Sequence, residues 1–281
     1  MNNVVRLQDG RDRQAGVSRT AWPVPEADNV MSELLRMLGA NLSEMRGVEP
    51  MPVAVRRLHA GDMLFHEGAG AEAMHFVRAG TFKIFRTAED GYEQVLGFAG
   101  RGEVMGFDAI SAGTHPTAAM ALEDSSVFVV LLCDFFSLGQ RISALDTLVH
   151  RAASSALANR AELADVMAAV AAEVRLARFL LQLSQRMVAC GQSPRRFHLR
   201  MSRRDIASYL GVAHETVSRS FSALVRWGLV RVDNREIEVL DMPGLRAFAL
   251  NTRRQVDEGI GIGASFARAQ ALPHDAQAQA S

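Results

Sequence analysis

The chain has 281 residues, of which 48% are hydrophobic, and its 31 basic and 31 acidic residues leave no net charge at pH 7. This length suits two domains, or one domain with extensions. The longest apolar run, residues 127–133, is too short to cross a bilayer, and the N-terminus carries charges where a secretion signal needs an apolar stretch. We therefore expect a cytoplasmic protein without membrane contact. Two cysteines, Cys133 and Cys190, form neither a disulfide framework nor a metal quartet.

The charges are distributed unevenly along the chain. The segment from Arg195 to Arg235 has nine arginines against three acidic residues, a local charge of +6, and the remainder is acidic to the same extent. A charged face that contacts only solvent mixes its signs more evenly. The basic segment therefore favours contact with the phosphates of nucleic acid.

The N-terminal half changes character twice. Residues 1–28 show no apolar periodicity and predict a flexible arm, and residues 31–42 can form a short amphipathic helix. Within residues 29–135, short apolar runs recur between glycines, with clear period-two alternation over residues 81–86. Many short strands at this spacing predict an all-β sandwich or barrel rather than alternating β–α units. Turns are expected at Glu67–Gly68, Ala79–Gly80, Asp90–Gly91 and Gly100–Gly102.

Residues 136–172 have the pattern of a long helix. Their apolar residues recur at alternating steps of three and four, as in the a and d positions of a coiled coil. We expect this helix to pair with a second copy of the chain; the alternative is a helix that lies on its own β domain. The residues of this predicted dimer seam are Ile142, Leu145, Val149, Ala152, Ala156, Asn159, Leu163, Val166 and Val170.

A C-terminal domain is expected over residues 173–250, with a first helix near 173–188 and a short strand at 197–201. Two short helices follow. Ser202 suits the N-cap of the first, with Asp205 completing a capping box, and Gly211 can take the positive φ of the turn. The second helix begins near Ala213 and is expected to bury Val217, Phe221, Leu224 and Val225.

The second helix carries four polar residues on its other side, namely His214, Glu215, Ser218 and Arg219. Donors and acceptors at the start of this helix favour a DNA reader over a bare helical hairpin. Residues 229–240 then alternate around Asp233–Asn234, which predicts a hairpin and makes the unit a winged helix. Residues 251–281 predict a flexible tail, to which we assign no role.

Three motifs carry a family resemblance: GEVMGFDAI at 102–110, HPTAAMALED at 115–124 and ETVSR at 215–219. With the order of the expected domains, residues 50–245 resemble the Crp/Fnr superfamily of bacterial transcription regulators, and its Fnr-like branch in particular. The resemblance implies an α+β fold, in which a cyclic-nucleotide-binding-like β-roll precedes a long dimerisation helix and a winged helix-turn-helix. It also implies a homodimeric transcription regulator, and we expect an activator.

Carried over to this sequence, the resemblance assigns base readers to the second helix. Arg219 is expected to donate two hydrogen bonds to guanine, Glu215 to accept from cytosine, and Ser218 to contact a neighbouring pair. Proteins with this motif typically read a TTGAT-type half-site, and a dimer reads its inverted repeat. Contacts to the DNA backbone are expected from Ser202, Arg203, Thr216 and His214.

The resemblance also suggests a contact with RNA polymerase. In Fnr-like activators a loop of the β-roll offers this surface, and here it corresponds to Thr87, Glu89, Asp90 and Gly91. A plain hairpin turn is the alternative.

The expected β-roll departs from the family pattern at the positions that would bind a ligand. A cyclic-nucleotide pocket needs a Gly-Glu pair and an Arg-Ser pair; Gly102–Glu103 is present, but His115–Pro116 stands where Arg-Ser falls. Proline lacks an amide proton and neutral histidine neutralises no phosphate, so the sequence disfavours a nucleotide. An iron–sulfur cluster needs four thiolates and is excluded by the cysteine count.

We therefore expect no required cofactor and no metal. One alternative is haem or another small molecule, with a ligand among His59, His66, His75 and His115, and another is a redox switch at Cys133 or Cys190. A competing class is a ligand-binding module whose helical end contacts protein rather than DNA. An enzyme is not expected, because no acid–base pair, nucleophile elbow or phosphate-binding glycine loop has a useful spacing.

Overall fold

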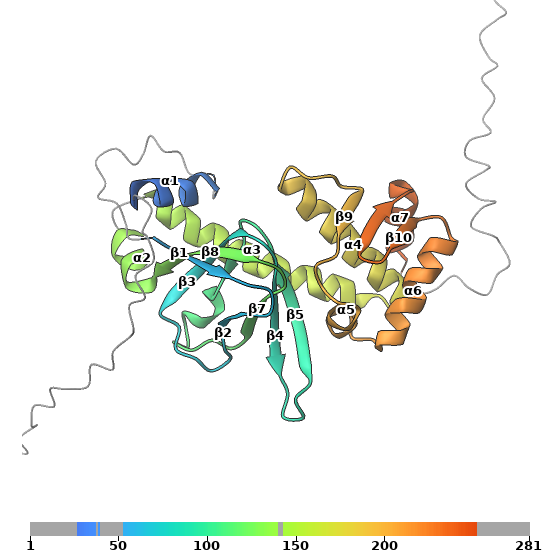
Figure 1. The fold of residues 1–281 in the computed structure, drawn as a ribbon, viewed down its shortest axis with the longest axis horizontal. Helices are drawn as coiled ribbons and strands as arrows, with labels where there is room; N and C mark the ends of the chain where they lie inside the picture. Colours follow the sequence, from blue (N-terminus) through green and yellow to red (C-terminus); the bar gives the residue numbers. More distant parts are fainter. Residues whose placement is uncertain (1–26, 38, 40–52, 140–142, 252–281) are drawn as a thin grey trace, which may run out of the picture.

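The computed structural model describes residues 27–37, 39, 53–139 and 143–251. The expected arm at 1–28 and tail at 251–281 lie almost entirely outside these ranges. Figure 1 shows the β-rich N-terminal part beside the helical C-terminal part, with the long helix α3 (Ser143–Ala168) running from one to the other. Among the described helices, none is both long and apolar enough to cross a membrane.

The N-terminal domain is built from two four-stranded antiparallel sheets. Their strand orders are β1-β8-β3-β6 and β2-β7-β4-β5, and β5 is therefore an edge strand. The strands are β1 Ala54–Leu58, β2 Met63–Phe65, β3 Ala73–Ala79, β4 Phe82–Thr87, β5 Glu93–Ala99, β6 Val104–Met105, β7 Ala118–Ala121 and β8 Ser125–Leu131, with a 3-10 turn at Phe107–Ala109. The predicted all-β organisation of this region is confirmed.

Glycines provide the tight turns between these strands. Gly68, Gly80, Gly91 and Gly102 have φ values of 79°, 95°, 82° and 84°, in the left-handed region that other residues rarely adopt. At Gly80 an added Cβ would lie only 2.0 Å from the hydroxyl oxygen of Ser125. The four turns predicted from the sequence are confirmed.

Helix α1 (Ala27–Met37) covers the outer face of the first sheet. On β3, Met74 and Phe76 pack toward α1, whereas Val77 points between the two sheets. Arg78 fixes the helix with hydrogen bonds of 2.8 and 2.9 Å to the Glu33 carboxylate. Because α1 begins at residue 27, the prediction of a helix that starts at residue 31 is wrong by one turn.

The single helix predicted over residues 136–172 is wrong in its extent. A short helix, α2 (Leu132–Gly139), ends at a glycine, and α3 ends at Ala168, before the bend that leads to α4 (Ala172–Ala189). Val170 lies in that bend with 71% of its surface exposed. Of the other predicted seam residues, Ile142 and the side chains of Leu145, Val149, Ala152, Ala156 and Asn159 lie outside the described part.

Two residues of the predicted seam contact the chain's own core. Val166 has no exposed surface and Leu163 is half-buried, and both pack in the cluster that contains α4 and the winged helix. Val166 is therefore not available to a second copy of the chain. The reason is the bend after Ala168, which folds α4 back against the last turn of α3.

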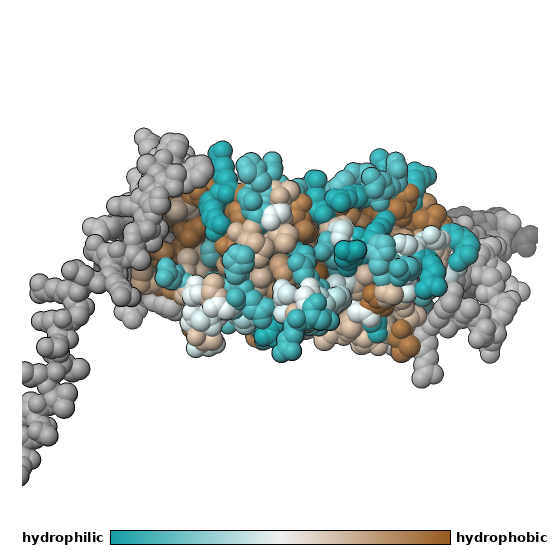
Figure 2. Space-filling model, turned by 60° about the horizontal axis from the view of Figure 1, so that its bottom comes forward, coloured by the Kyte–Doolittle hydropathy of each residue, from teal (hydrophilic) through white to brown (hydrophobic). Residues whose placement is uncertain are grey.

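Other apolar residues of this region are exposed. On α3, Leu157 has 67% of its surface exposed. In the view of Figure 2, hydrophilic residues cover much of the surface, with smaller apolar areas between them.

The C-terminal domain is a winged helix. After α4, the chain forms β9 (Arg196–His198), α5 (Arg203–Leu210), α6 (His214–Arg226), β10 (Val230–Asp233), β11 (Glu236–Val239) and α7 (Met242–Ala249). The three strands pair in the order β10-β11-β9. The expected α+β order of β-roll, long helix and winged helix is confirmed, although β9 begins and ends earlier than the strand predicted over residues 197–201.

Candidate nucleic-acid interface

The start of α5 is fixed by a capping box. The Ser202 hydroxyl accepts a hydrogen bond from the Asp205 amide at 3.1 Å, and the Asp205 carboxylate accepts from the Ser202 amide at 2.9 Å. At the other end, Gly211 has φ of 62° and closes the helix in the left-handed conformation. Both features follow the prediction, and together they set where α6 begins.

Helix α6 has one buried and one exposed side. Val217, Phe221 and Leu224 are buried in the core of the winged helix. The prediction that Val225 is buried is wrong, because 44% of its surface is exposed and Ala223 is buried instead. The exposed side, which we call the reader face, consists of Glu215, Ser218, Arg219, Ser222 and Arg226.

The reader face contains the three predicted base readers and two residues that sequence reasoning missed. Ser222 follows Arg219 by three residues and Arg226 follows Ser222 by four, which places them on the same side of the helix as Glu215 and Arg219. This spacing was the available signal. Arg226 extends the positive charge of the reader face to the end of α6.

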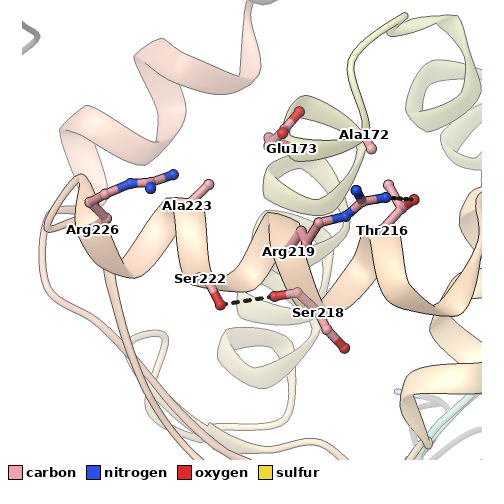
Figure 3. Close-up of a pocket in the computed structure, with 8 residues that line it drawn as sticks. All are labelled: Ala172, Glu173, Thr216, Ser218, Arg219, Ser222, Ala223 and Arg226. Atoms are coloured by element: carbon pink, nitrogen blue, oxygen red, sulfur yellow. Dashed lines mark hydrogen bonds between the residues drawn. The ribbon is translucent and has the colours of Figure 1, made fainter.

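A groove of about 660 Å³ separates α6 from the start of α4, where Glu173 lies. In Figure 3, Arg219 and Arg226 extend toward this groove, whereas the hydroxyl of Ser218 points away from it. Arg219 Nη2 donates to the Thr216 hydroxyl at 3.2 Å, and Ser222 donates to the Ser218 carbonyl at 3.1 Å. The Arg219 contact lies at the long end of the usual range for a hydrogen bond.

The predicted backbone contacts lie in two different environments. His214 is exposed at the first position of α6, and Thr216 is half-buried at the rim of the groove. The Ser202 hydroxyl instead donates to Asp205 at 2.6 Å, and Arg203 lies on the ring of Phe221. The Ser202 hydroxyl is thus engaged in the capping box, and the Arg203 guanidinium packs on a ring of its own domain.

The winged helix packs directly on the edge strand β5. Ser208 of α5 donates to the Glu93 carbonyl at 2.8 Å and accepts from the Val95 amide at 2.8 Å. Lys83, only 6% exposed, lies 2.5 Å from a Glu93 oxygen and 3.2 Å from an Asp205 oxygen. We call Lys83, Glu93, Asp205 and Ser208 the edge contact; it joins the two domains through the helix that precedes the reader face.

The charge of Asp205 is favoured by this arrangement. Burial alone raises the pKa of a carboxyl group, but hydrogen bonds from Ser202 and the ammonium group of Lys83 lower the pKa of Asp205 below its ordinary value. Asp205 therefore stays ionised while it caps α5 and pairs with the β-roll.

Aromatic rings fill part of the interior of the β-roll. His115 stacks on Phe65 with ring centroids 3.9 Å apart, and His75 lies 6.4 Å from His115. Burial, aided by His115 and Arg56, lowers the pKa of His75 to about 4, and burial also lowers the pKa of His115. Both imidazoles are therefore neutral near pH 7.

The residues at the positions of a nucleotide pocket contact other parts of the chain. A neutral, stacked imidazole stands at position 115, where the resemblance places the phosphate ligands. Glu103, which belongs to the Gly-Glu pair that such a pocket needs, accepts from the Gly100 amide at 2.7 Å and lies 3.8 Å from Arg186 of α4. Burial raises the pKa of Glu103, and the nearby guanidinium of Arg186 opposes this rise.

The other residues that the sequence offered as ligands or redox groups are exposed, unlike the buried His75 and His115. His59 and His66 are exposed, and His59 lies 3.3 Å from Asp124. Cys133 and Cys190 are exposed free thiols. Within the described ranges, no three histidine, cysteine or acidic side chains are grouped as metal ligands.

The predicted polymerase-contact loop is the tip of the β4–β5 hairpin. Figure 1 shows that this hairpin projects from the body of the β-roll. Its turn is ordered by hydrogen bonds from the Gly91 amide to the Ala88 carbonyl and from the Tyr92 amide to Asp90, both 2.9 Å. The loop is therefore an exposed and defined surface at the end of the strands that form the edge contact.

Comparisons with known proteins agree with both domains. A family model for a Crp-like helix-turn-helix domain matches residues 174–248, and one for a cyclic nucleotide-binding domain matches residues 55–141. The chain is 35% identical over 209 residues to the transcriptional regulatory protein btr of Bordetella pertussis, covering 74% of this chain and 86% of that protein. It is 32% identical over 222 residues to the transcriptional activator protein Anr of Pseudomonas protegens, covering 79% and 91%.

A solved structure has the same arrangement. FixK2 from Bradyrhizobium japonicum matches with a TM-score of 0.64 and 25% identity, and the match covers 72% of this chain and 99% of that one.

Proposed function

This chain belongs to the Crp/Fnr family of transcription regulators, and we propose that it binds a TTGAT-type inverted repeat as a homodimer and activates transcription. The observation that carries this proposal is the reader face of α6. Five polar side chains are exposed there on one side of the second helix of a helix-turn-helix, and a buried apolar side fixes the helix against its domain. The two curated relatives are transcription regulators, and we propose no enzymatic activity.

Each predicted base reader has a chemical role on the reader face. Arg219 offers two donors to the O6 and N7 atoms of guanine, Glu215 accepts from the amino group of cytosine, and Ser218 contacts a neighbouring pair. The nine arginines between residues 195 and 235 supply positive charge for the phosphates.

A homodimer explains why the proposed DNA site is an inverted repeat, because each copy of the chain reads one half-site. The α3 helix remains the proposed interface, and exposed Leu157 supports an apolar contact on it. Charges introduced at Val166 are no test of this dimer, since Val166 is buried in the chain's own core.

Activation is proposed to use the exposed tip of the β4–β5 hairpin as a contact for RNA polymerase. Support comes from the projection of this hairpin in Figure 1 and from its ordered turn at Gly91. The relative Anr is named as a transcriptional activator, which agrees with this direction of regulation.

The experiment that tests DNA reading replaces one proposed base reader and one base pair, and compares the affinities. Arg219→Ala should lose about 1–3 kcal/mol of discrimination at one G·C pair of each half-site. Affinities of the wild type and the variant are measured by fluorescence anisotropy on the repeat and on a repeat with that G·C pair replaced by A·T. The wild type should distinguish the two DNAs and Arg219→Ala should not, with two chains bound per repeat.

A matched control and an opposite outcome complete this test. Arg231→Ala, in the wing rather than on the reader face, should keep its discrimination between the two DNAs. Equal discrimination by wild type and Arg219→Ala would show that Arg219 is not the reader. Binding that does not weaken with added salt would favour a protein partner over DNA, because phosphate contacts release counterions.

For the β-roll we propose that no resident cofactor is required. The packing of Phe65, His75 and His115 supports this, because Phe65 stacks on His115 and also lies at a tilt to His75. The absorption spectrum and native mass of protein purified without oxygen should show only the polypeptide. A haem band or added mass would instead assign a ligand to the β-roll.

A further inference from the structure

Arg203 contacts two other parts of the winged helix at once. It is the first residue of α5, and its guanidinium carbon lies 3.6 Å from the centre of the Phe221 ring on α6. Its Nη2 donates at 3.2 Å to the carbonyl of Asn234, in the turn of the wing between β10 and β11. A single side chain therefore joins the two helices of the helix-turn-helix to the wing.

The same contacts leave the guanidinium poorly placed for a phosphate. Nη1 is buried and has no hydrogen-bond partner among the residues that the structure describes. Burial also lowers the pKa of Arg203 below its ordinary value. One face of the group is covered by the ring, and a buried donor without a partner is costly, so the arrangement needs a compensating gain.

The wing turn is held at two neighbouring carbonyls. Asn234 has φ of 54°, a left-handed conformation that asparagine tolerates better than most residues. Its carbonyl accepts from Arg203, and the next carbonyl, that of Arg235, accepts from the Leu199 amide at 2.8 Å. A two-residue turn between short strands is thereby fixed to the rest of the domain from outside the hairpin.

We propose that Arg203 is a positioning residue for DNA reading, which holds the wing turn against the recognition helix instead of contacting a phosphate. This inference rests on the proposed function, because the distance between wing and reader face has a consequence only when both meet DNA. A planar guanidinium can stack on the Phe221 ring and donate sideways to Asn234 at the same time. The compact ammonium group of lysine has the charge but not this shape.

The first test compares charge with shape at position 203. Arg203→Lys and Arg203→Met should both weaken binding to the inverted repeat by about tenfold, because both lose the stacked contact. Arg204→Lys, at the exposed neighbouring position, is the matched control and should bind as the wild type does. Phe221→Leu removes the ring from a buried site that DNA does not reach, and combining it with Arg203→Lys should add little further loss.

The second test needs no DNA. Hydrogen exchange at the Leu199 amide should become faster in Arg203→Lys, while exchange in the β-roll strands stays the same. This readout also shows whether the variant is folded. It reports the wing turn because the Leu199 amide is bonded to the carbonyl of Arg235.

The proposal is overturned if Arg203→Lys binds like the wild type while Arg203→Met lowers the slope of log K against log salt by about one, the signature of a lost phosphate contact. It is also overturned if exchange at Leu199 is unchanged in Arg203→Lys. Failure of the wild type to bind the repeat would instead overturn the proposed function, so the two failures are distinguishable.

Discussion

The winged helix and the β-roll place their polar side chains in opposite ways. The reader face of α6 exposes five of them, whereas the β-roll buries Lys83, His75 and His115 in its interior or at its edge. A surface that binds an outside partner must keep its donors and acceptors accessible. The side chains proposed to read DNA are therefore exposed on the surface, whereas the buried polar groups of the β-roll contact the chain itself.

The two regions nevertheless share one core. Phe98 of β5 lies 6.0 Å from Phe179 of α4 and 5.4 Å from Tyr209 of α5, measured between ring centroids. Arg186 of α4 donates to the Phe98 carbonyl at 2.7 Å. With the edge contact, these interactions fix the helix-turn-helix on the second sheet. A change at the β-roll edge should therefore alter the stability of the contact between the two domains.

The largest expected effect comes from breaking the edge contact. Lys83→Met should lower the free energy of unfolding by about 3 kcal/mol, because it leaves the carboxylates of Glu93 and Asp205 without their shared cation in a partly buried site. Urea unfolding measures this loss. If the polar groups of the β-roll serve the fold, the variant should keep its preference between the two DNAs of the Arg219 experiment.

The control for Lys83 is Arg57→Met, which removes an exposed positive charge from β1 and should change stability by less than about 0.5 kcal/mol. A similarly small change in Lys83→Met would show that the edge contact contributes little. A changed base preference would show that the β-roll edge takes part in reading, which would weaken the contrast between the two regions.

The parts of the molecule that sequence predicted well depend on local chemistry. The capping box of Ser202 and Asp205, the left-handed Gly211 and the turn at Asn234 all involve residues within a few positions of one another. Such signals act before the chain is compact, so their meaning does not change with the tertiary fold. The same holds for the polar side of α6, where His214, Glu215, Ser218 and Arg219 are exposed as predicted.

The parts that sequence predicted poorly depend on distant neighbours. Val166 fits a heptad seam, but the bend after α3 turns it into the core of its own domain. Arg203 has the charge of a phosphate ligand, and only the approach of Phe221 and Asn234 gives it another role. Apolar spacing and charge show that a residue has a partner; they do not show which element supplies it.

A smaller loss of stability is expected at acid pH, because of the buried His75 in the β-roll. The pKa of His75 is lowered from 6.5 to about 4, so the unfolded chain binds a proton that the folded chain does not between these pH values. Stability from this residue is present above pH 6.5 and is lost as pH falls toward 4. Between pH 7 and 4.5 the loss should reach about 2 kcal/mol.

His75→Phe should remove that part of the loss, because phenylalanine has no proton to bind in either state. Urea unfolding at several pH values from 7 to 4.5 measures the difference from the wild type. His59→Gln, at an exposed histidine of the same domain, is the matched control and should keep the wild-type dependence. An identical loss in wild type and His75→Phe would mean that His75 is accessible to protons in the folded state. The interior of the β-roll would then be open to solvent, and the contrast with the exposed reader face would no longer hold.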